Sequence, residues 1–346
     1  MTSDITRPAE TSGQVKRSRL GRLLGVQVVG VGSYAPEVVV RNEDLIALGH
    51  DPDWIVQRTG IRERRHAQPG TATSDMAVEA AKRCIEQSGL DPREIDLVLL
   101  GTFTPDLLLP ATACLVQDRL GLRAPALDLH AACSSFIFAL LTGMQYVASG
   151  CSRLVLVIGA DCNSRVLDPK DVRTYPLFGD GAGAVLLAPG GPRQGLVSFA
   201  IGADGSGYDL LVREMGGTRM PFSRDAGNEG RQFMKMDGRP IFKWAVRMLS
   251  ETVREILREA ELTLEEIDLV IFHQANQRII DAAVRELGVD LDKVFCNLER
   301  YGNTSSASIP LALDEAYRAG RVHRGQNLLL SGFGAGLTWG TTILRW

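Results

Sequence analysis

Short runs of mostly apolar residues alternate along the chain with longer segments in which apolar positions recur every three or four residues. The runs at 25–32, 94–101 and 153–159 are rich in Val, Leu and Ile, and a glycine ends each of them. Such runs indicate buried strands, whereas the longer spacing indicates helices. Strands alternating with helices predict an α/β fold with a layered sheet of largely parallel strands.

Helices are expected between these runs, and glycines or short polar side chains mark several of their ends. The segment that begins at Cys133 and stops at Gly150 is apolar on nearly every face, so we expect it to be buried. We expect one helix to begin at 42–46 and further helices to cover 53–60, 73–89, 109–121 and 133–150.

The second half of the chain repeats the order of the first. Residues 94–98 recur as 266–270, 172 positions later, and the turn at 132–135 is echoed by the turn at 303–306. Two further segments recur at similar offsets, 118–121 as 285–288 and 150–156 as 325–330. Landmarks in the same order at a nearly constant offset indicate a duplicated α/β unit.

This repeat predicts an N-terminal half at 23–190 and a C-terminal half at 191–346, joined near a Pro-Gly-Gly-Pro segment. Residues 203–240 have no counterpart in the alignment of the halves. They are rich in Gly, Arg and Met, and we expect a long excursion near the functional site. Residues 1–22 are polar and lack the apolar core of a signal peptide, so we expect a disordered tail.

Cys133 lies at the turn between a short strand at 125–130 and the apolar helix. A thiol at a helix N-terminus faces unpaired N–H groups and the positive end of the helix dipole, which both favour the nucleophilic thiolate. The alternative is that Cys133 packs as a small hydrophobic residue, as most free cysteines do.

Two polar residues of the second half are expected to converge on Cys133. His273 directly follows the strand at 268–272, and Asn303 precedes the helix that corresponds to the Cys133 helix. In a pseudo-twofold arrangement these loops meet at strand ends, where α/β folds bind ligands. His273 as a buried core histidine and Asn303 as a helix cap are the alternatives, but three converging residues favour catalysis.

Charge and composition narrow the class of protein. The 346 residues carry a formal net charge of −3, which argues against a nucleic-acid or membrane-surface protein. No run approaches the roughly 18 apolar residues of a membrane span. The six cysteines show no CxxC spacing, which predicts a reducing, cytoplasmic setting. The five histidines are scattered along the chain, so no metal site is expected.

Six motifs give the chain a resemblance to a known family. They lie at 53–61, 131–136, 178–183, 272–276, 301–307 and 332–340, and together they span the chain from about residue 25 to its C-terminus. The sequence resembles the β-ketoacyl-acyl-carrier-protein synthase III family, condensing enzymes of the thiolase superfamily. The resemblance implies a thiolase-like five-layered αβαβα fold built from two pseudo-twofold related halves, and a homodimer.

The resemblance also implies a reaction in two steps. An acyl group moves from coenzyme A to Cys133, and malonyl-acyl carrier protein then loses CO2 and attacks the acyl-enzyme in a decarboxylative Claisen condensation that initiates fatty-acid synthesis. His273 and Asn303 would donate hydrogen bonds to the developing enolate. Backbone N–H groups of Cys133 and Ala335 would form the oxyanion hole for the acyl transfer. No cofactor beyond the coenzyme A thioester substrate is expected.

Binding residues follow from the same motifs. The resemblance places coenzyme A against Trp54, Arg58, Gly238, Phe242 and Asn276. It places the acidic carrier protein against Lys243, Arg278 and Arg285, for which solvated helix charges are the alternative. Where the family often has an adenine-contacting arginine, this chain has Val172, followed by Arg173.

The acyl pocket is expected to include Leu109, Asn163 and Phe178. Leu109 stands where the family often has a phenylalanine from the dimer partner, and the smaller side chain would admit longer or branched acyl groups. Asn163 stands where an apolar residue is common, so part of the wall would be polar. His130, just before the cysteine loop, is unusual and receives no catalytic role.

Other readings fit the sequence less well. The glycines at 179–183 lack the Lys-Ser/Thr pair of a P-loop and the spacing of a dinucleotide-binding loop. The C-terminal glycine loop at 332–340 has no second cysteine, as degradative thiolases require. Two alternatives stay open: a priming ketosynthase or acyltransferase of a polyketide or other specialised pathway that uses a non-acetyl group, and a non-catalytic acyl-binding partner subunit.

Overall fold

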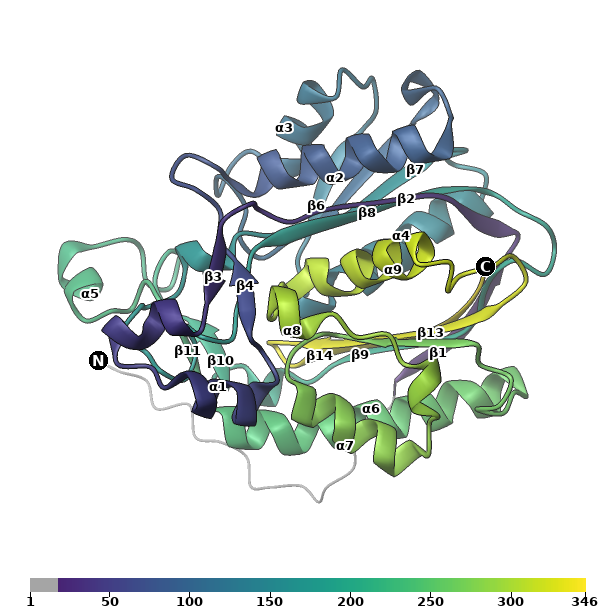
Figure 1. Cartoon of the computed structure of the whole chain (residues 1–346). Helices are drawn as coiled ribbons and strands as arrows, with labels where there is room; N and C mark the ends of the chain where they lie inside the picture. The colour runs from purple at the N-terminus through teal and green to yellow at the C-terminus, as the bar shows by residue number, and fades with distance from the viewer. Residues whose placement is uncertain (1–17) are drawn as a thin grey trace.

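Two five-stranded sheets lie face to face with a pair of helices between them and further helices on both outer faces (Figure 1). The structure is a computed structural model that describes residues 18–346. The first sheet has the order β2 (Val26–Tyr34), β8 (Gly181–Pro189), β7 (Val155–Asp161), β5 (Leu97–Gly101) and β6 (Ala126–Leu129). The second has the order β1 (Arg19–Leu24), β9 (Gly195–Ala203), β14 (Thr338–Arg345), β13 (Asn327–Gly334) and β12 (Leu269–Phe272).

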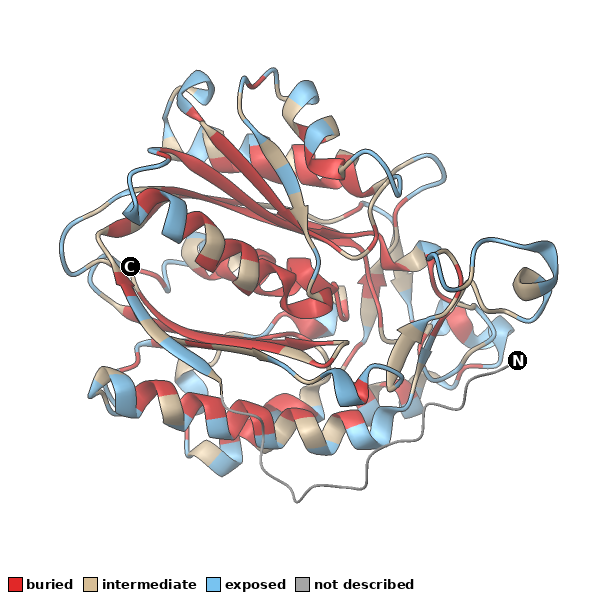
Figure 2. Ribbon diagram, turned by 180° about the vertical axis from the view of Figure 1, so that it is seen from behind, coloured by how far each residue is buried: buried red, intermediate tan, exposed pale blue. Residues whose placement is uncertain are grey.

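The helices form three layers around these sheets (Figure 1). The outer layer of the first sheet is α2 (Thr73–Ser88) and α3 (Thr112–Arg119), and the outer layer of the second is α6 (Gly238–Ala260) and α7 (Gln277–Leu287). The central layer is α4 (Ser135–Ala148) and α9 (Ser308–Arg318). Figure 2 shows that the central helices are buried along much of their length, whereas the outer ones keep exposed faces. The five-layered α/β fold predicted from the resemblance is confirmed.

The prediction of largely parallel sheets is wrong. Among the named strands of residues 18–346, β5 pairs in parallel with β6 and β7, and β12 pairs in parallel with β13. The other strand pairs in the two large sheets are antiparallel. The reason is local for β13 and β14, because three residues connect them and such a short link can only join antiparallel strands. Buried runs such as β8 and β14 look alike in sequence whichever direction they run.

The first described strand changes the prediction for the N-terminus. Residues 19–22, assigned above to a disordered tail, belong to β1, which pairs antiparallel with β9 from Arg19 opposite Ile201 to Leu24 opposite Gly195. The strand is short, and only part of it is buried, so its sequence carries little periodic signal. Residues 1–17 of the predicted tail lie outside the described residues.

The excursion between β9 and α6 contains a two-stranded sheet of β10 (Leu211–Arg213) and β11 (Met234–Met236) and the short helix α5 (Arg224–Asn228).

Among the described residues, no helix has the length and apolar character needed to cross a bilayer. The remaining elements are β3 (Val39–Arg41), β4 (Glu63–Arg65), α1 (Pro52–Thr59), α8 (Leu298–Tyr301) and the 3-10 turns η1 (Glu43–Leu48), η2 (Pro92–Glu94), η3 (Ala132–Ser134), η4 (Asn163–Arg165), η5 (Gly205–Gly207), η6 (Leu291–Lys293) and η7 (Ser305–Ala307).

Candidate active site

Two matching turns, η3 before α4 and η7 before α9, meet between the sheets. Each begins with a non-glycine residue of positive φ, Ala132 at 48° and Ser305 at 54°. A Cβ on Gly159 of β7 would lie 2.4 Å from the carbonyl oxygen of Ser306, so only glycine allows η7 to pack this closely. The close packing brings the loop of Asn303 against that of Cys133, as predicted.

Cys133 is buried, with 6% of its surface exposed, and the Ser305 hydroxyl donates a hydrogen bond of 3.3 Å to its Sγ. Burial raises the pKa of the Cys133 thiol to about 12, although the Ser305 hydroxyl and the backbone amide of Cys133 both lower it. Burial therefore opposes the effect that we expected from the helix N-terminus. Desolvation of the charged form outweighs the local donors, so the resting site holds a thiol.

His273 directly follows β12 and is buried, with 1% of its surface exposed. Burial lowers the pKa of His273 to about 3, so the ring is neutral at physiological pH. Its Nδ1 lies 2.6 Å from Oγ of Ser308, which also accepts a longer bond of 3.4 Å from the N–H of Gln274. We assign the Ser308 hydroxyl as the donor to Nδ1, and with this tautomer the His273 proton lies on Nε2 as a donor.

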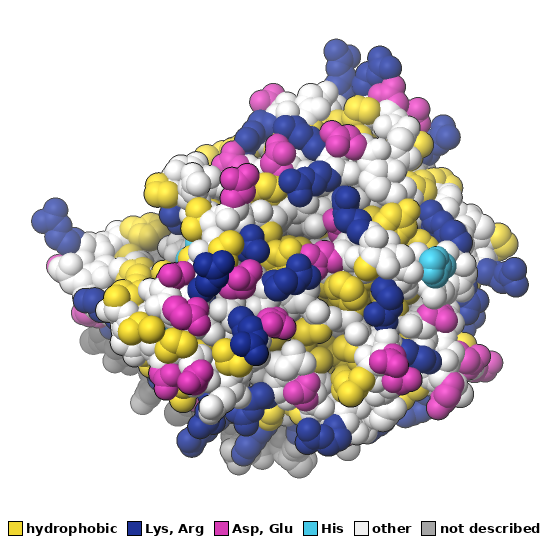
Figure 3. Space-filling view, in the orientation of Figure 1, with side chains coloured by type: hydrophobic (Ala, Val, Ile, Leu, Met, Phe, Trp, Pro, Cys, Tyr) yellow, Lys and Arg dark blue, Asp and Glu magenta, His cyan; other side chains and the backbone are white. Residues whose placement is uncertain are grey.

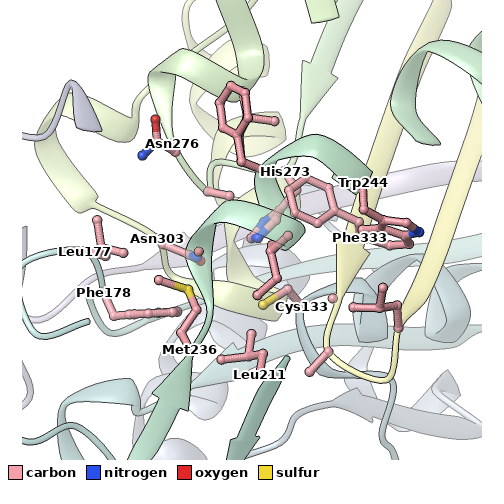
Figure 4. A pocket seen from close by; sticks show the side chains of 18 residues that line it. Cys133, Leu177, Phe178, Leu211, Met236, Trp244, His273, Asn276, Asn303 and Phe333 are labelled. Atoms are coloured by element: carbon pink, nitrogen blue, oxygen red, sulfur yellow. The ribbon is translucent and has the colours of Figure 1, made fainter. Parts of the chain in front are cut away.

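Asn303 is fixed by its backbone and its side-chain oxygen. Its N–H donates to the carbonyl of Leu177 at 2.8 Å, and its Oδ1 accepts a 2.8 Å bond from the N–H of Ser305. The side-chain NH2 is then the end that remains for a ligand. Figure 4 shows His273 and Asn303 directed toward the same region as the sulfur of Cys133.

A narrow inner cavity of about 120 Å³ joins these three residues. Its wall is mostly apolar and includes Leu211 and Met236 of the excursion, which confirms that residues 203–240 approach the site. Ala335 also lines it, and a Cβ on the neighbouring Gly334 would lie 2.6 Å from the backbone nitrogen of Cys133. Glycine thus allows the loop of Ala335 to approach the Cys133 amide closely.

The residues predicted for coenzyme A fall into two groups. Gly238, Phe242 and Asn276 line the inner cavity together with Cys133. Trp54 and Arg58 lie outside it on α1, where the guanidinium carbon of Arg58 is 5.9 Å from the centre of the Trp54 ring. Asn276 links the groups, because its Nδ2 donates to the carbonyl of Arg58 at 3.1 Å.

The residues near the usual adenine contact are on the surface. Val172 is 44% exposed, and the Arg173 side chain forms an ion pair of 3.3 Å with Asp171. Arg173 lines a separate polar groove that shares Met236 with the inner cavity.

An outer cavity of about 540 Å³ opens on the other side of Cys133. Phe178 and Leu211 line both cavities, whereas His130 lines only the outer one. Of the other predicted acyl-pocket residues, Leu109 is 87% exposed and Asn163 is completely buried. Neither lines either cavity, since Asn163 Nδ2 instead donates to the carbonyl of Gly179 at 2.6 Å.

The three predicted carrier-protein residues are exposed on the second outer layer. Lys243 is on α6, and Arg278 and Arg285 are on α7. The guanidinium carbon of Arg278 lies 5.7 Å from the Phe242 ring, so this charge is beside the inner cavity. Figure 3 shows basic side chains interspersed with acidic ones on this face.

Sequence reasoning missed several residues of the site. The roles of Ser305 and Ser308 were not seen, although both serines lie in or next to the Asn-Thr-Ser-Ser motif that carried the resemblance. Trp244 of α6 was missed as well, and only its helical spacing after Gly238 would have signalled it. Among residues 18–346, no group of three or more His, Cys, Asp or Glu side chains is arranged to hold a metal ion.

Comparison with known proteins gives a consistent result. The family described as 3-oxoacyl-[acyl-carrier-protein (ACP)] synthase III matches residues 127–205, and its C-terminal family matches 257–346. The β-ketoacyl-[acyl-carrier-protein] synthase III of Rhodopirellula baltica is 52% identical, over 94% of this chain and 100% of that protein.

Solved structures agree. The crystal structure of 3-oxoacyl-[acyl-carrier-protein] synthase III from Aquifex aeolicus superposes with a TM-score of 0.84 and 42% identity, covering 93% of this chain and 100% of that one. The priming β-ketosynthase of the R1128 polyketide pathway gives a TM-score of 0.85 and 38% identity, covering 94% and 97%. The shared fold, the matching motifs and these identities show that the chain belongs to the β-ketoacyl-acyl-carrier-protein synthase III family.

Proposed function

We propose that this protein condenses an acyl-CoA primer with malonyl-acyl carrier protein through an acyl-Cys133 intermediate, releasing CO2 and a β-ketoacyl-carrier protein. The observation that carries the proposal is the convergence of Cys133, His273 and Asn303 on one buried cavity. Fatty-acid initiation is the activity that the names of the relatives favour. The proposal places the enzyme in the cytoplasm.

The first step is acyl transfer. The sulfur of Cys133 attacks the thioester carbonyl, coenzyme A leaves, and the proton of the Cys133 thiol ends on the coenzyme A sulfur. The tetrahedral intermediate carries a negative oxygen, for which the N–H groups of Cys133 and Ala335 form the oxyanion hole. Because the thiol starts protonated, its proton has to move as the sulfur attacks. A covalent acyl-enzyme divides the reaction into two easier steps.

The second step is decarboxylation and condensation. When the malonyl thioester loses CO2, negative charge builds on the thioester oxygen, and the Nε2–H of His273 and the NH2 of Asn303 donate to it. The enolate carbon then attacks the acyl carbonyl and expels the Cys133 thiolate, which takes up a proton from solvent. A neutral His273 serves this step well, because it donates a hydrogen bond without needing protonation.

Substrate entry follows the route from α1 to the inner cavity. We place the adenine and phosphates of coenzyme A against Trp54 and Arg58, and the pantetheine arm against Gly238, Phe242 and Asn276. The carrier protein would dock on Lys243, Arg278 and Arg285, which are exposed beside that entrance.

A homodimer would complete the acyl pocket. Leu107, Leu108 and Leu109 are 51%, 77% and 87% exposed, and β6 is an edge strand of the first sheet. Exposed apolar residues beside an open edge favour association with another chain. In this arrangement Leu109 of one protomer covers the outer cavity of its partner.

A second candidate is a priming synthase that uses an acyl group larger than acetyl. The volume of the outer cavity, about 540 Å³, favours it, as does leucine rather than phenylalanine at position 109. The similarity to the R1128 priming ketosynthase is compatible with this candidate.

The test is intact-protein mass spectrometry after incubation with a panel of acyl-CoAs, with Cys133→Ala as the control. We expect a mass gain that the substitution abolishes and that malonyl-carrier protein discharges. Fastest labelling by acetyl-CoA would favour fatty-acid initiation, and fastest labelling by long or branched chains would favour the second candidate. No labelling from any acyl-CoA would contradict the proposal and would favour carrier-protein donors or a non-catalytic subunit.

A further inference from the structure

Asp161, at the end of β7, is completely buried, yet it is outside the chemistry described above. Its Oδ1 accepts bonds of 2.8–3.1 Å from the hydroxyls of Thr102 and Thr104 and from the N–H groups of Phe103 and Thr104. Its Oδ2 accepts from the N–H of Ser306 at 3.0 Å and from the Ser306 hydroxyl at 2.6 Å. A buried carboxylate is costly unless donors surround it, and here six do.

The donors come from both halves of the molecule. The residues that bind Oδ1 follow β5 in the first half, whereas Ser306 belongs to η7 of the second half. The Asp161 carboxylate therefore joins the loop after β5 to the turn before α9. The Ser306 Oγ also lies 2.9 Å from the carbonyl oxygen of Gly101, but its single proton goes to the closer Asp161 carboxylate.

The turn that Asp161 binds carries the groups that face the substrate. Ser305, next to Ser306, donates to the sulfur of Cys133 through its hydroxyl and to Asn303 Oδ1 through its N–H. The φ of 54° at Ser305 is a strained conformation for a residue other than glycine, and surrounding contacts have to offset that strain. The hydrogen bonds that Ser306 donates to the Asp161 carboxylate are charge-assisted, and they hold the residue that follows Ser305 in place.

We propose that Asp161 is a positioning residue that fixes the Ser305–Ser306 turn and so aims the Asn303 amide at the thioester oxygen in the decarboxylation step. The inference rests on the proposed function for that step, but the placement of the turn does not. The chemistry of Asp161 is to accept hydrogen bonds, and it touches no reacting atom.

Asp161→Asn is the decisive variant, because it keeps the shape and replaces one acceptor oxygen by an NH2 donor. Whichever side the NH2 takes, it faces backbone N–H groups: that of Ser306, or those of Phe103 and Thr104. The matched control is Asp96→Asn. Asp96 accepts backbone N–H bonds of 2.8 Å from Arg153 and 3.3 Å from Leu154, at the opposite end of the same strands.

Two readouts separate positioning from general damage. We expect Asp161→Asn to slow malonyl decarboxylation by about 100-fold while the rate of Cys133 acylation and the KM for acyl-CoA change by less than about threefold. The reason is that Asn303 acts in decarboxylation, whereas the oxyanion hole proposed for acylation uses the N–H groups of Cys133 and Ala335, which Asp161 does not bind. We expect amide hydrogen exchange in a peptide covering 303–308 to rise about tenfold, and exchange at 153–158 to rise in the Asp96→Asn control instead.

The proposal is overturned if both steps slow equally, or if neither slows and exchange at 303–308 equals that of the unsubstituted protein. Should Asp161→Asn fail to fold, Ser306→Ala removes only the second-half hydroxyl, and the same selective loss, about tenfold, is then required. If the unsubstituted protein is not acylated by any acyl-CoA, the proposed function fails. The exchange experiment then decides by itself whether Asp161 positions the turn.

Discussion

The turns η3 and η7 share one backbone path and carry different chemistry. In each, a residue of positive φ opens the turn, and the next residue is Cys133 in the first half and Ser306 in the second. The sulfur of Cys133 faces the cavities, whereas the Ser306 hydroxyl is turned onto Asp161 and Gly101. In the proposed function Cys133 is the nucleophile, whereas Ser306 of the second half forms hydrogen bonds to Asp161 of the first.

A second pair of equivalent positions makes the same point. His273 follows β12, and the position 172 residues earlier is Gly101 at the end of β5. A Cβ on Gly101 would lie 2.8 Å from the backbone carbon of Ser135, so the first half has no room for a side chain there. Under the proposed function, the nucleophile comes from one half of the molecule and the hydrogen-bond donors come from the other.

The sharpest test of this division is Cys133→Ala. We expect acylation and condensation to fall by at least about 1,000-fold, because the nucleophile is lost. Decarboxylation of malonyl-carrier protein should continue, because its donors come from the second half. Release of CO2 without β-ketoacyl product measures this, and a loss of CO2 release in step with acylation would show that the two turns do not act separately.

The reverse pattern is expected for His273→Ala and Asn303→Ala. Each removes one donor to the enolate oxygen, so CO2 release should fall by about 100- to 1,000-fold, the usual cost of losing an oxyanion donor. Cys133 acylation, followed by mass, should stay within about fivefold. The division is contradicted if, in either variant, the rate of Cys133 acylation falls by as large a factor as the rate of CO2 release.

Ser308→Ala probes how His273 is oriented. The variant removes the 2.6 Å partner of Nδ1, and we expect CO2 release to fall by about 10-fold, the scale of losing a partner that fixes a histidine tautomer. Ser308→Thr retains a hydroxyl and should recover most of the rate. Equal rates for the Ala variant and the unsubstituted protein would show that Ser308 does not set the tautomer.

The last prediction concerns stability and depends on pH. The pKa of His273 is lowered to about 3 in the folded protein, below its ordinary value near 6.5, so the unfolded chain binds the extra proton first. The free energy of unfolding should therefore fall as pH drops below 6.5, by about 2 kcal/mol from this residue at pH 5. Denaturant unfolding of the protein and of His273→Gln at pH 7 and pH 5 measures the difference, which should narrow at pH 5. A constant difference would mean that His273 has the same pKa in the folded protein as in the unfolded chain.

Sequence reasoning identified the repeat, the layers and the three converging residues, because motifs and strand ends are local signals. It did not find the bond from Ser305 to Cys133, which joins residues 172 positions apart. It also did not reveal how strongly burial opposes ionisation of the Cys133 thiol, because the helix N-terminus is visible in the sequence and the degree of burial is not. The prediction of strand direction was wrong for a similar reason, because the direction of a strand depends on how distant segments are connected in space.

The strand β1 gives the two halves a shared boundary. It precedes the whole first half in the chain, yet it closes the outer edge of the second sheet beside β9, whose residues lie some 170 to 180 positions later. A ribosome therefore releases the edge of the second sheet first and its centre last. Cutting the chain near residue 190 would not yield two complete units, because the C-terminal piece would expose the backbone of β9 and leave an open edge for aggregation. Through this strand, residues at the start of the described chain complete the sheet formed by its C-terminal part.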